Sequence, residues 1–125
     1  MTICLQVVVK GDLTADGFKK TLVSMTGSKE YPPDVPTLWD LRDVNLAHFK
    51  ELPIPSFIDI EKRFPLRDNA KIAVIAQSNF SYGLCRMYCA HLEMALVKQD
   101  FMVFRKYDNA LAWLLNSQES VQYLH

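Results

Sequence analysis

The sequence predicts an α/β fold in which about four helices cover a largely parallel β-sheet. Runs of β-branched and apolar residues alternate four times with stretches of helical periodicity along the 125 residues, and such alternation is typical of βα units. The run at 71–77, KIAVIAQ, is apolar almost throughout, which favours a strand covered on both faces at the centre of a parallel sheet. The length suits one core, so we expect a single domain at 1–117 and a C-terminal tail at 118–125.

In the first half of the chain, two strands flank a helix. Residues 3–9, ICLQVVV, are β-branched and apolar and predict the first strand. Thr14 is expected to cap the following helix, and Gly27 is expected to end it. Residues 37–41, TLWDL, predict a short second strand, and 42–53 are expected to be irregular.

The second half repeats the alternation. Prolines at the start of 53–64 suit the first turn of a helix, and the strand at 71–77 follows it. A longer helix is expected at 80–98, followed by a strand at 101–105, FMVFR. Asp108 is a candidate N-cap for the last helix, NALAWLLN.

Composition excludes several classes of protein. Fourteen Lys and Arg residues balance 14 Asp and Glu residues. The chain therefore has no net positive charge that would favour nucleic-acid binding. No apolar stretch is long enough to cross a bilayer, so we expect no integral membrane association. Three cysteines without framework spacing suit a reducing compartment, and a cytoplasmic protein is expected. Neither a G-x-G-x-x-G fingerprint nor a Walker loop occurs, and no cofactor is expected.

The segment SNFSYGLCRMYCAH, 78–91, places two cysteines and a histidine close together. On a helix, Cys85 and Cys89 lie on one stripe with Tyr88 and Leu92, whereas His91 lies near the opposite edge. Reduced cysteine is commonly buried and behaves as a small hydrophobe. We therefore expect the thiols to pack against the sheet, and we expect no metal site.

The other side of this helix carries Met87, Ala90, Met94 and Val97 where a surface helix usually carries charge. An apolar second face indicates an interface with a second copy or a protein partner, or contact with an apolar small molecule. Isolated apolar residues are also common on protein surfaces. Periodicity leaves both interpretations open.

Polar residues follow two of the strands and form a candidate ligand or anion site. Asp40 and Arg42 lie at the end of the second strand, and Ser78 follows the third, where open α/β sheets commonly bind ligands. The structural alternatives are that Asp40 pairs with an arginine and that Ser78 caps the next helix.

Arg86 and Tyr82 complete this candidate set. Arg86 lies near the start of its helix, where the helix dipole disfavours a cation. We expect Arg86 to pair with Asp40 or Asp43, or alternatively with an anionic ligand.

No catalytic set emerges. The sequence has no G-x-S-x-G elbow, and none of His48, His91 and His125 lies beside an obvious nucleophile. No catalytic residue is therefore expected.

Four segments together resemble a known family. They are TLWDLRDV at 37–44, KIAVIAQ at 71–77, FSYGLCRMY at 80–88 and VFRKYDNALAWLL at 103–115. The chain resembles the small bacterial SpoIIAA-like proteins, described as STAS or STAS/SEC14 domains. The resemblance implies a βα superhelix with a mixed, mostly parallel sheet of four or five strands, whose first strand or strands run antiparallel at one edge.

The resemblance also implies two modes of action. Relatives that antagonise anti-sigma factors bind a protein partner and are switched by phosphorylation in a D-S-x-G context, whereas SEC14-like relatives bind lipids in an apolar cleft. No serine or threonine occurs from Asp40 to Pro55, so the usual phosphorylation site is absent.

Three functions follow, in order of preference. The first is a non-catalytic binding or regulatory module that acts through protein–protein interaction or homodimerisation. The second is a small apolar-ligand or lipid-binding domain. The third is an enzyme that would use Asp40, Arg42, Tyr82 and Arg86.

Overall fold

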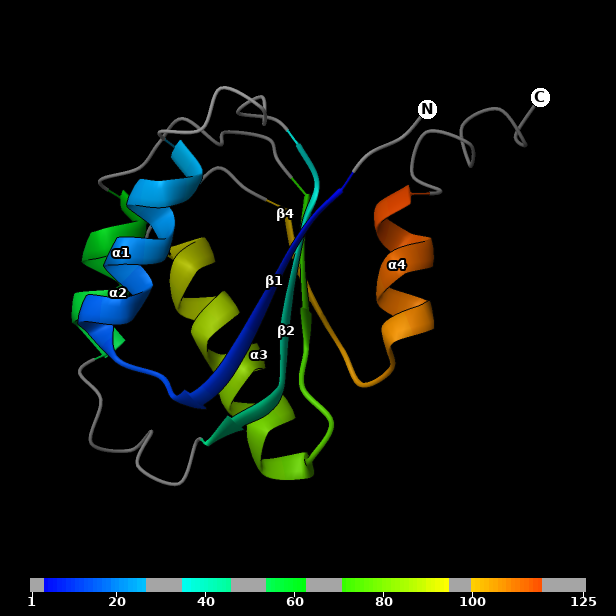
Figure 1. Ribbon diagram of the computed structural model, residues 1–125. Helices are drawn as coiled ribbons and strands as arrows, with labels where there is room; N and C mark the ends of the chain where they lie inside the picture. Colours follow the sequence, from blue (N-terminus) through cyan, green and yellow to red (C-terminus); the bar gives the residue numbers. More distant parts are fainter. Residues whose placement is uncertain (1–3, 27–34, 46–53, 63–70, 95–99, 116–125) are drawn as a thin grey trace.

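A computed structural model describes residues 4–26, 35–45, 54–62, 71–94 and 100–115. Strands and helices alternate along these residues (Figure 1). The elements are β1 (Leu5–Asp12), α1 (Ala15–Thr26), β2 (Thr37–Asn45), α2 (Ile54–Lys62), β3 (Lys71–Ile75), α3 (Asn79–Met94), β4 (Asp100–Phe104) and α4 (Tyr107–Leu115). The predicted α/β class and alternation are confirmed.

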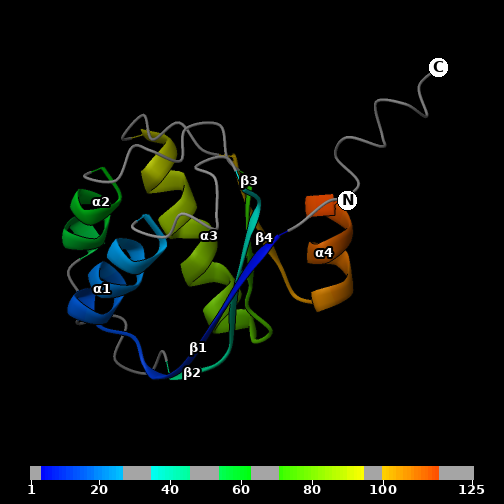
Figure 2. The same ribbon diagram turned by 45° about the horizontal axis from the view of Figure 1, so that its top comes forward.

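The four strands form one sheet in the order β1-β2-β3-β4, and each neighbouring pair is parallel. The mixed sheet that the resemblance implied is therefore wrong for the described residues, because β1 at the edge also runs parallel. Each βα unit advances the chain by one strand. Crossover connections that have the same hand and advance in the same direction place their helices on the same face of the sheet. The helices α1, α2 and α3 therefore lie together on one face, and α4 lies alone on the other face (Figures 1 and 2).

The core has two halves, one on each face of the sheet. On the face of α1–α3, the core cluster includes Phe18, Leu22, Trp39, Phe57, Ile60 and Ile72. Beneath α4, the core cluster includes Leu38, Ala73, Ile75, Ala110 and Leu114. Leu38 and Trp39 are neighbours that enter opposite halves, because successive side chains of a strand point to opposite faces. The prediction that β3 is covered on both faces is confirmed.

The predicted cap of α1 is confirmed, and the predicted cap of α4 is wrong. The backbone N–H of Gly17 donates to Thr14 Oγ1 at 3.0 Å, so Thr14 caps α1. Asp108 does not cap α4, because the helix begins at Tyr107 and the N–H of Ala110 donates to the carbonyl of Lys106 at 3.2 Å. Asp108 instead lies in the first turn, where a carboxylate is favoured by the helix dipole.

The second strand is longer than predicted. β2 continues through Arg42–Asn45, which were expected to be irregular, because Lys10, Gly11 and Asp12 of β1 pair with Asp43, Val44 and Asn45. This pairing follows a register shift between Val8 and Lys10. The strand beyond Leu41 could not be recognised from the sequence, because the side chains there are largely exposed and the residues are mostly polar.

Several predicted features lie outside the described residues. They are the C-terminal tail at 118–125, the loop residues 46–53, the side chain of Val97, and His48 and His125.

Candidate functional site

The polar residues at the end of β2 form an ion pair rather than an open site. Arg42 Nε donates to Asp40 Oδ1 at 2.9 Å, and Arg42 Nη2 donates to Oδ2 at 2.7 Å. The backbone N–H of Arg42 donates to Oδ1 at 3.1 Å as well. The two side chains are neighbours because residues two apart on a strand share a face. The structural alternative for Asp40 is therefore confirmed.

This pairing sets the charge states of both groups. The hydrogen bonds from the Arg42 guanidinium lower the pKa of the Asp40 carboxyl below its usual value, although burial opposes the shift. Asp40 reciprocally raises the pKa of Arg42. A carboxylate with a lowered pKa and three donors is poorly suited to accept a proton from a substrate.

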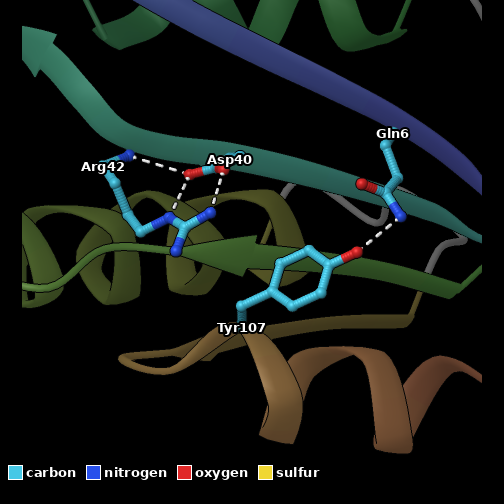
Figure 3. A network of polar contacts seen from close by, with 4 residues as sticks. All are labelled: Gln6, Asp40, Arg42 and Tyr107. Atoms are coloured by element: carbon cyan, nitrogen blue, oxygen red, sulfur yellow. Dashed lines mark hydrogen bonds and ion pairs between the residues drawn. The ribbon is translucent and has the colours of Figure 1, made fainter.

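Two residues that the sequence did not single out extend the network (Figure 3). The Arg42 guanidinium lies over the ring of Tyr107, 5.5 Å from its centroid. Gln6 Nε2 donates to Tyr107 Oη at 2.8 Å. The network therefore joins β1, β2 and the start of α4 on one face of the sheet. A polar Gln6 within the otherwise apolar run at 3–9 was the available signal, but its partner is 101 residues away.

Ser78 caps α3, as the structural alternative stated. The N–H of Ser81 donates to Ser78 Oγ at 3.0 Å, and the N–H of Tyr82 donates to the Ser78 carbonyl at 2.9 Å. The hydroxyls of Ser78 and Ser81 are 2.7 Å apart. This arrangement satisfies donors at the helix start that would otherwise remain free.

Arg86 does not pair with an acidic residue in the described part of the chain, so that expectation was wrong. The Asp40 carboxylate is already occupied by Arg42, and Arg86 lies over the ring of Tyr82 at 5.9 Å. A second cation, Arg105, also lies over this ring, 4.3 Å from its centroid, and it donates to Asn79 Oδ1 at 2.7 Å. Sequence reasoning missed Arg105, which follows β4 and meets α3 only in the folded chain.

The candidate site is divided between two places. Arg42 and Ser78 line a surface pocket of about 390 Å³ at the end of β2 and β3. Tyr82 and Arg86 line a separate groove of about 440 Å³ between α3 and β4. The five predicted residues therefore do not surround one ligand.

The predicted cysteine stripe packs as expected. Cys85 is buried and Cys89 is partly buried, and Leu92 has no exposed surface. Burial raises the pKa of Cys85 to about 11 and that of Cys89 to about 12, so both are protonated thiols at neutral pH. Within the described residues, no group of three His, Cys, Asp or Glu is placed to hold a metal ion.

An apolar cavity of about 80 Å³ lies where α1, α2 and α3 meet the sheet. Its walls include Trp39, Phe57 and Tyr88, and Phe57 and Tyr88 meet edge to face at 6.4 Å between centroids. The Tyr88 hydroxyl is buried and has no hydrogen-bond partner among the described residues. Burial raises the pKa of Tyr88, and the nearby Glu61 carboxylate adds to the shift.

The predicted second face of α3 is exposed. Met87 is 41 % exposed and Met94 is 79 % exposed, and Ala90 between them is also exposed. On the adjoining β4, Met102 is 44 % exposed. Ala90 and Met102 both line the groove beside α3. The Met102 side chain itself lies on the α4 face of the sheet, because it shares a face with Phe104 and its partner Ala73.

None of the described helices has both the length and the apolar character needed to cross a membrane. Comparisons of the chain with protein-family models, with curated proteins and with solved structures found no match.

Proposed function

We propose that the chain is a non-catalytic binding module of the SpoIIAA-like (STAS/SEC14) type that acts through protein–protein contact. The observation that carries the proposal is the exposed methionine face of α3, formed by Met87 and Met94 beside the groove along β4. Methionine side chains are flexible and polarisable, and they are overused at surfaces that bind other proteins. We define the α3–β4 surface as Arg86, Met87, Ala90, Glu93 and Met94 of α3, with the adjoining groove along β4.

The chemistry of the remaining polar groups supports this proposal. Asp40 is bound to Arg42, Ser78 is bound to the start of α3, and the buried thiols are protonated at neutral pH. Each group therefore has a structural role that accounts for its position. An enzyme using Asp40, Arg42, Tyr82 and Arg86 ranks last, because these residues lie in two separate places.

The topology also supports the SpoIIAA-like type. The resemblance implies a βα superhelix in which each unit adds one strand, and the observed order β1-β2-β3-β4 follows that progression. The all-parallel edge is the point of departure from the implied mixed sheet.

An apolar-ligand domain is the second candidate, and the cavity beside Phe57 and Tyr88 favours it. The cavity is about 80 Å³, whereas pockets for drug-sized ligands measure roughly 300–1,000 Å³. A lipid would therefore have to displace the aromatic side chains that pack around Phe57. This cost places the ligand-binding candidate second.

Native mass spectrometry of freshly purified full chain separates these two functions. The proposed module is expected to give only the mass of the bare chain or its multiples. A retained mass of several hundred daltons, lost on organic extraction, would contradict the proposal and support a bound apolar ligand.

A photoreactive amino acid at Met94 tests the location of the contact surface in cells that make the full chain. The matched control carries the same amino acid at Val8, which is 54 % exposed on β1. Cross-links to protein are expected from position 94 and not from position 8. Equal cross-linking from both positions would contradict the assignment of the α3–β4 surface.

A further inference from the structure

The charged residues of the α3–β4 surface are arranged symmetrically about a small residue. Arg86 and Glu93 lie seven positions apart on α3, which is about two turns or 10.5 Å along the helix axis. Ala90 lies between them, and all three residues line the groove. Neither Arg86 nor Glu93 forms an ion pair with another described residue. Two opposite charges are therefore presented on one face of a helix, and neither has an ion-pair partner in the described part of the chain.

Such a face is complementary to itself when turned by a two-fold axis. If two copies of α3 pack antiparallel with their Ala90 residues in contact, Arg86 of each copy lies opposite Glu93 of the other. Isologous contacts of this kind form two identical ion pairs from one sequence. Alanine at the centre allows close approach of the helices, since it has little side-chain volume.

The apolar residues of the surface agree with this geometry. Met87 and Met94 flank Ala90 at three and four positions, on a stripe beside the charged one. Both would be covered by the second helix, which would remove their exposed 41 % and 79 % from water. Burial of the methionine side chains then supplies affinity, whereas the ion pairs set the register of the two helices.

The edge of the sheet beside α3 is also open in the described part of the chain. β4 pairs with β3 alone, and the carbonyl of Phe104 accepts from the N–H of Ala76 at 2.8 Å on that side. Because backbone groups alternate in direction along a strand, those of Phe101 and Val103 face away from β3, toward the groove that these residues line. An uncovered edge next to an apolar helix face is a surface that proteins usually protect.

We infer that the α3–β4 surface binds a second copy of this chain, with the two α3 helices antiparallel and Arg86 of each paired with Glu93 of the other. This inference rests on the proposed function, because it names the partner of the same surface. The charge pattern favours a second copy over an unrelated protein, since Arg86 and Glu93 on either side of Ala90 make this face complementary to itself.

A charge-exchange series on the full chain tests the inference by sedimentation velocity over a range of concentrations. The wild type is expected to dimerise. Arg86→Glu and Glu93→Arg each replace two attractions by two repulsions, and each is expected to weaken the dimer about tenfold or more. The double variant restores opposite charges and is expected to return to within about threefold of wild type.

Two further variants test whether the effects arise at the proposed contact. Ala90→Arg places two arginines against each other at the two-fold axis and is expected to give a monomer. Asp16→Lys makes a charge change on the exposed face of α1 and is expected to leave the dimer unchanged. Circular dichroism checks that every variant remains folded.

Three results would overturn the inference. They are a wild-type chain that is monomeric at all concentrations, a dimer indifferent to both single exchanges, and a double variant as weak as the single variants. A monomer that still cross-links to another protein from position 94 would leave the proposed function intact. A retained small molecule would instead contradict the proposed function itself.

Discussion

Asp40 and Arg42 form a two-pronged ion pair on the α4 face of β2, with Nε–Oδ1 and Nη2–Oδ2 distances of 2.9 and 2.7 Å (Figure 3). The Asp40 side chain is only 10 % exposed, whereas that of Arg42 is 36 % exposed. The aspartate therefore loses more hydration on folding and depends more on the pair than the arginine does. Four predictions follow from this network and from the packing of α3.

Arg42→Met is expected to lower the free energy of unfolding by about 1–2 kcal/mol, because it leaves the buried Asp40 carboxylate without its charged donor. The measurement is urea denaturation followed by circular dichroism. Lys20→Met is the matched control, since Lys20 and Asp16 form an ion pair whose side chains are 79 % and 75 % exposed. That variant is expected to cost less than about 0.5 kcal/mol. Equal losses would mean that the Asp40–Arg42 pair contributes no more than a surface pair.

The free energy of unfolding is expected to depend on pH through the ionisation of Asp40. Its pKa is lowered in the folded chain by hydrogen bonds from Arg42, whereas an unfolded aspartate titrates at about 3.9. The folded state therefore holds fewer protons, and the contribution of Asp40 is complete above the unfolded pKa. It is lost as pH falls through the lowered folded pKa.

The comparison that isolates this contribution is wild type against Asp40→Asn. The difference in their unfolding free energies is expected to be constant from about pH 5 to 8 and to shrink below about pH 4. A difference that stays constant well into acid would contradict the assignment of the shift to Asp40.

Cys85 and Cys89 are expected to react slowly with iodoacetamide at pH 7.5 in the folded chain. Burial raises their pKa values to about 11 and about 12, and the thiolate is the reacting form. Relative to the urea-unfolded chain, with a cysteine pKa of about 8.5, the rates are expected to fall roughly a hundredfold or more. Peptide mapping by mass spectrometry distinguishes labelling of these two cysteines from labelling of Cys4. Labelling at the unfolded rate would show that the stripe is open to solvent.

Tyr88→Phe is expected to leave stability unchanged or to raise it by up to about 1 kcal/mol, because the buried hydroxyl has no partner among the described residues. Thermal denaturation measures the effect. The matched control is Tyr107→Phe, which removes the acceptor of the 2.8 Å bond from Gln6 and is expected to be destabilising by about 0.5–1 kcal/mol. A loss from Tyr88→Phe as large as that of the control would mean that the Tyr88 hydroxyl has a partner.

Local signals in the sequence were sufficient to predict the βα alternation and the caps at Thr14 and Ser78. A cap depends on the side chain and on backbone groups two or three residues away, so a short window contains all the information. The same reasoning placed Cys85 inward and Met94 outward, because helical periodicity orders the faces without reference to the rest of the chain.

The sequence could not assign partners that lie far apart along the chain. Arg105 reaches Tyr82 from the end of β4, and Gln6 donates to Tyr107, which is 101 residues away. Arg86 was expected to pair with a distant carboxylate, whereas Asp40 pairs with its near neighbour Arg42. The candidate site was therefore predicted as one cluster and is divided in the structure between two places.

By itself, the sequence determined the class of fold, the order of its elements and the inward and outward faces of α3, since each depends on local propensity and periodicity. Only the tertiary structure decided that the β1 edge is parallel, that β2 extends to Asn45 and that Gln6 meets Tyr107. Strand pairing and contacts across a sheet depend on how distant segments are brought together. Their energies come from burial and hydrogen bonds that exist only once the segments have met.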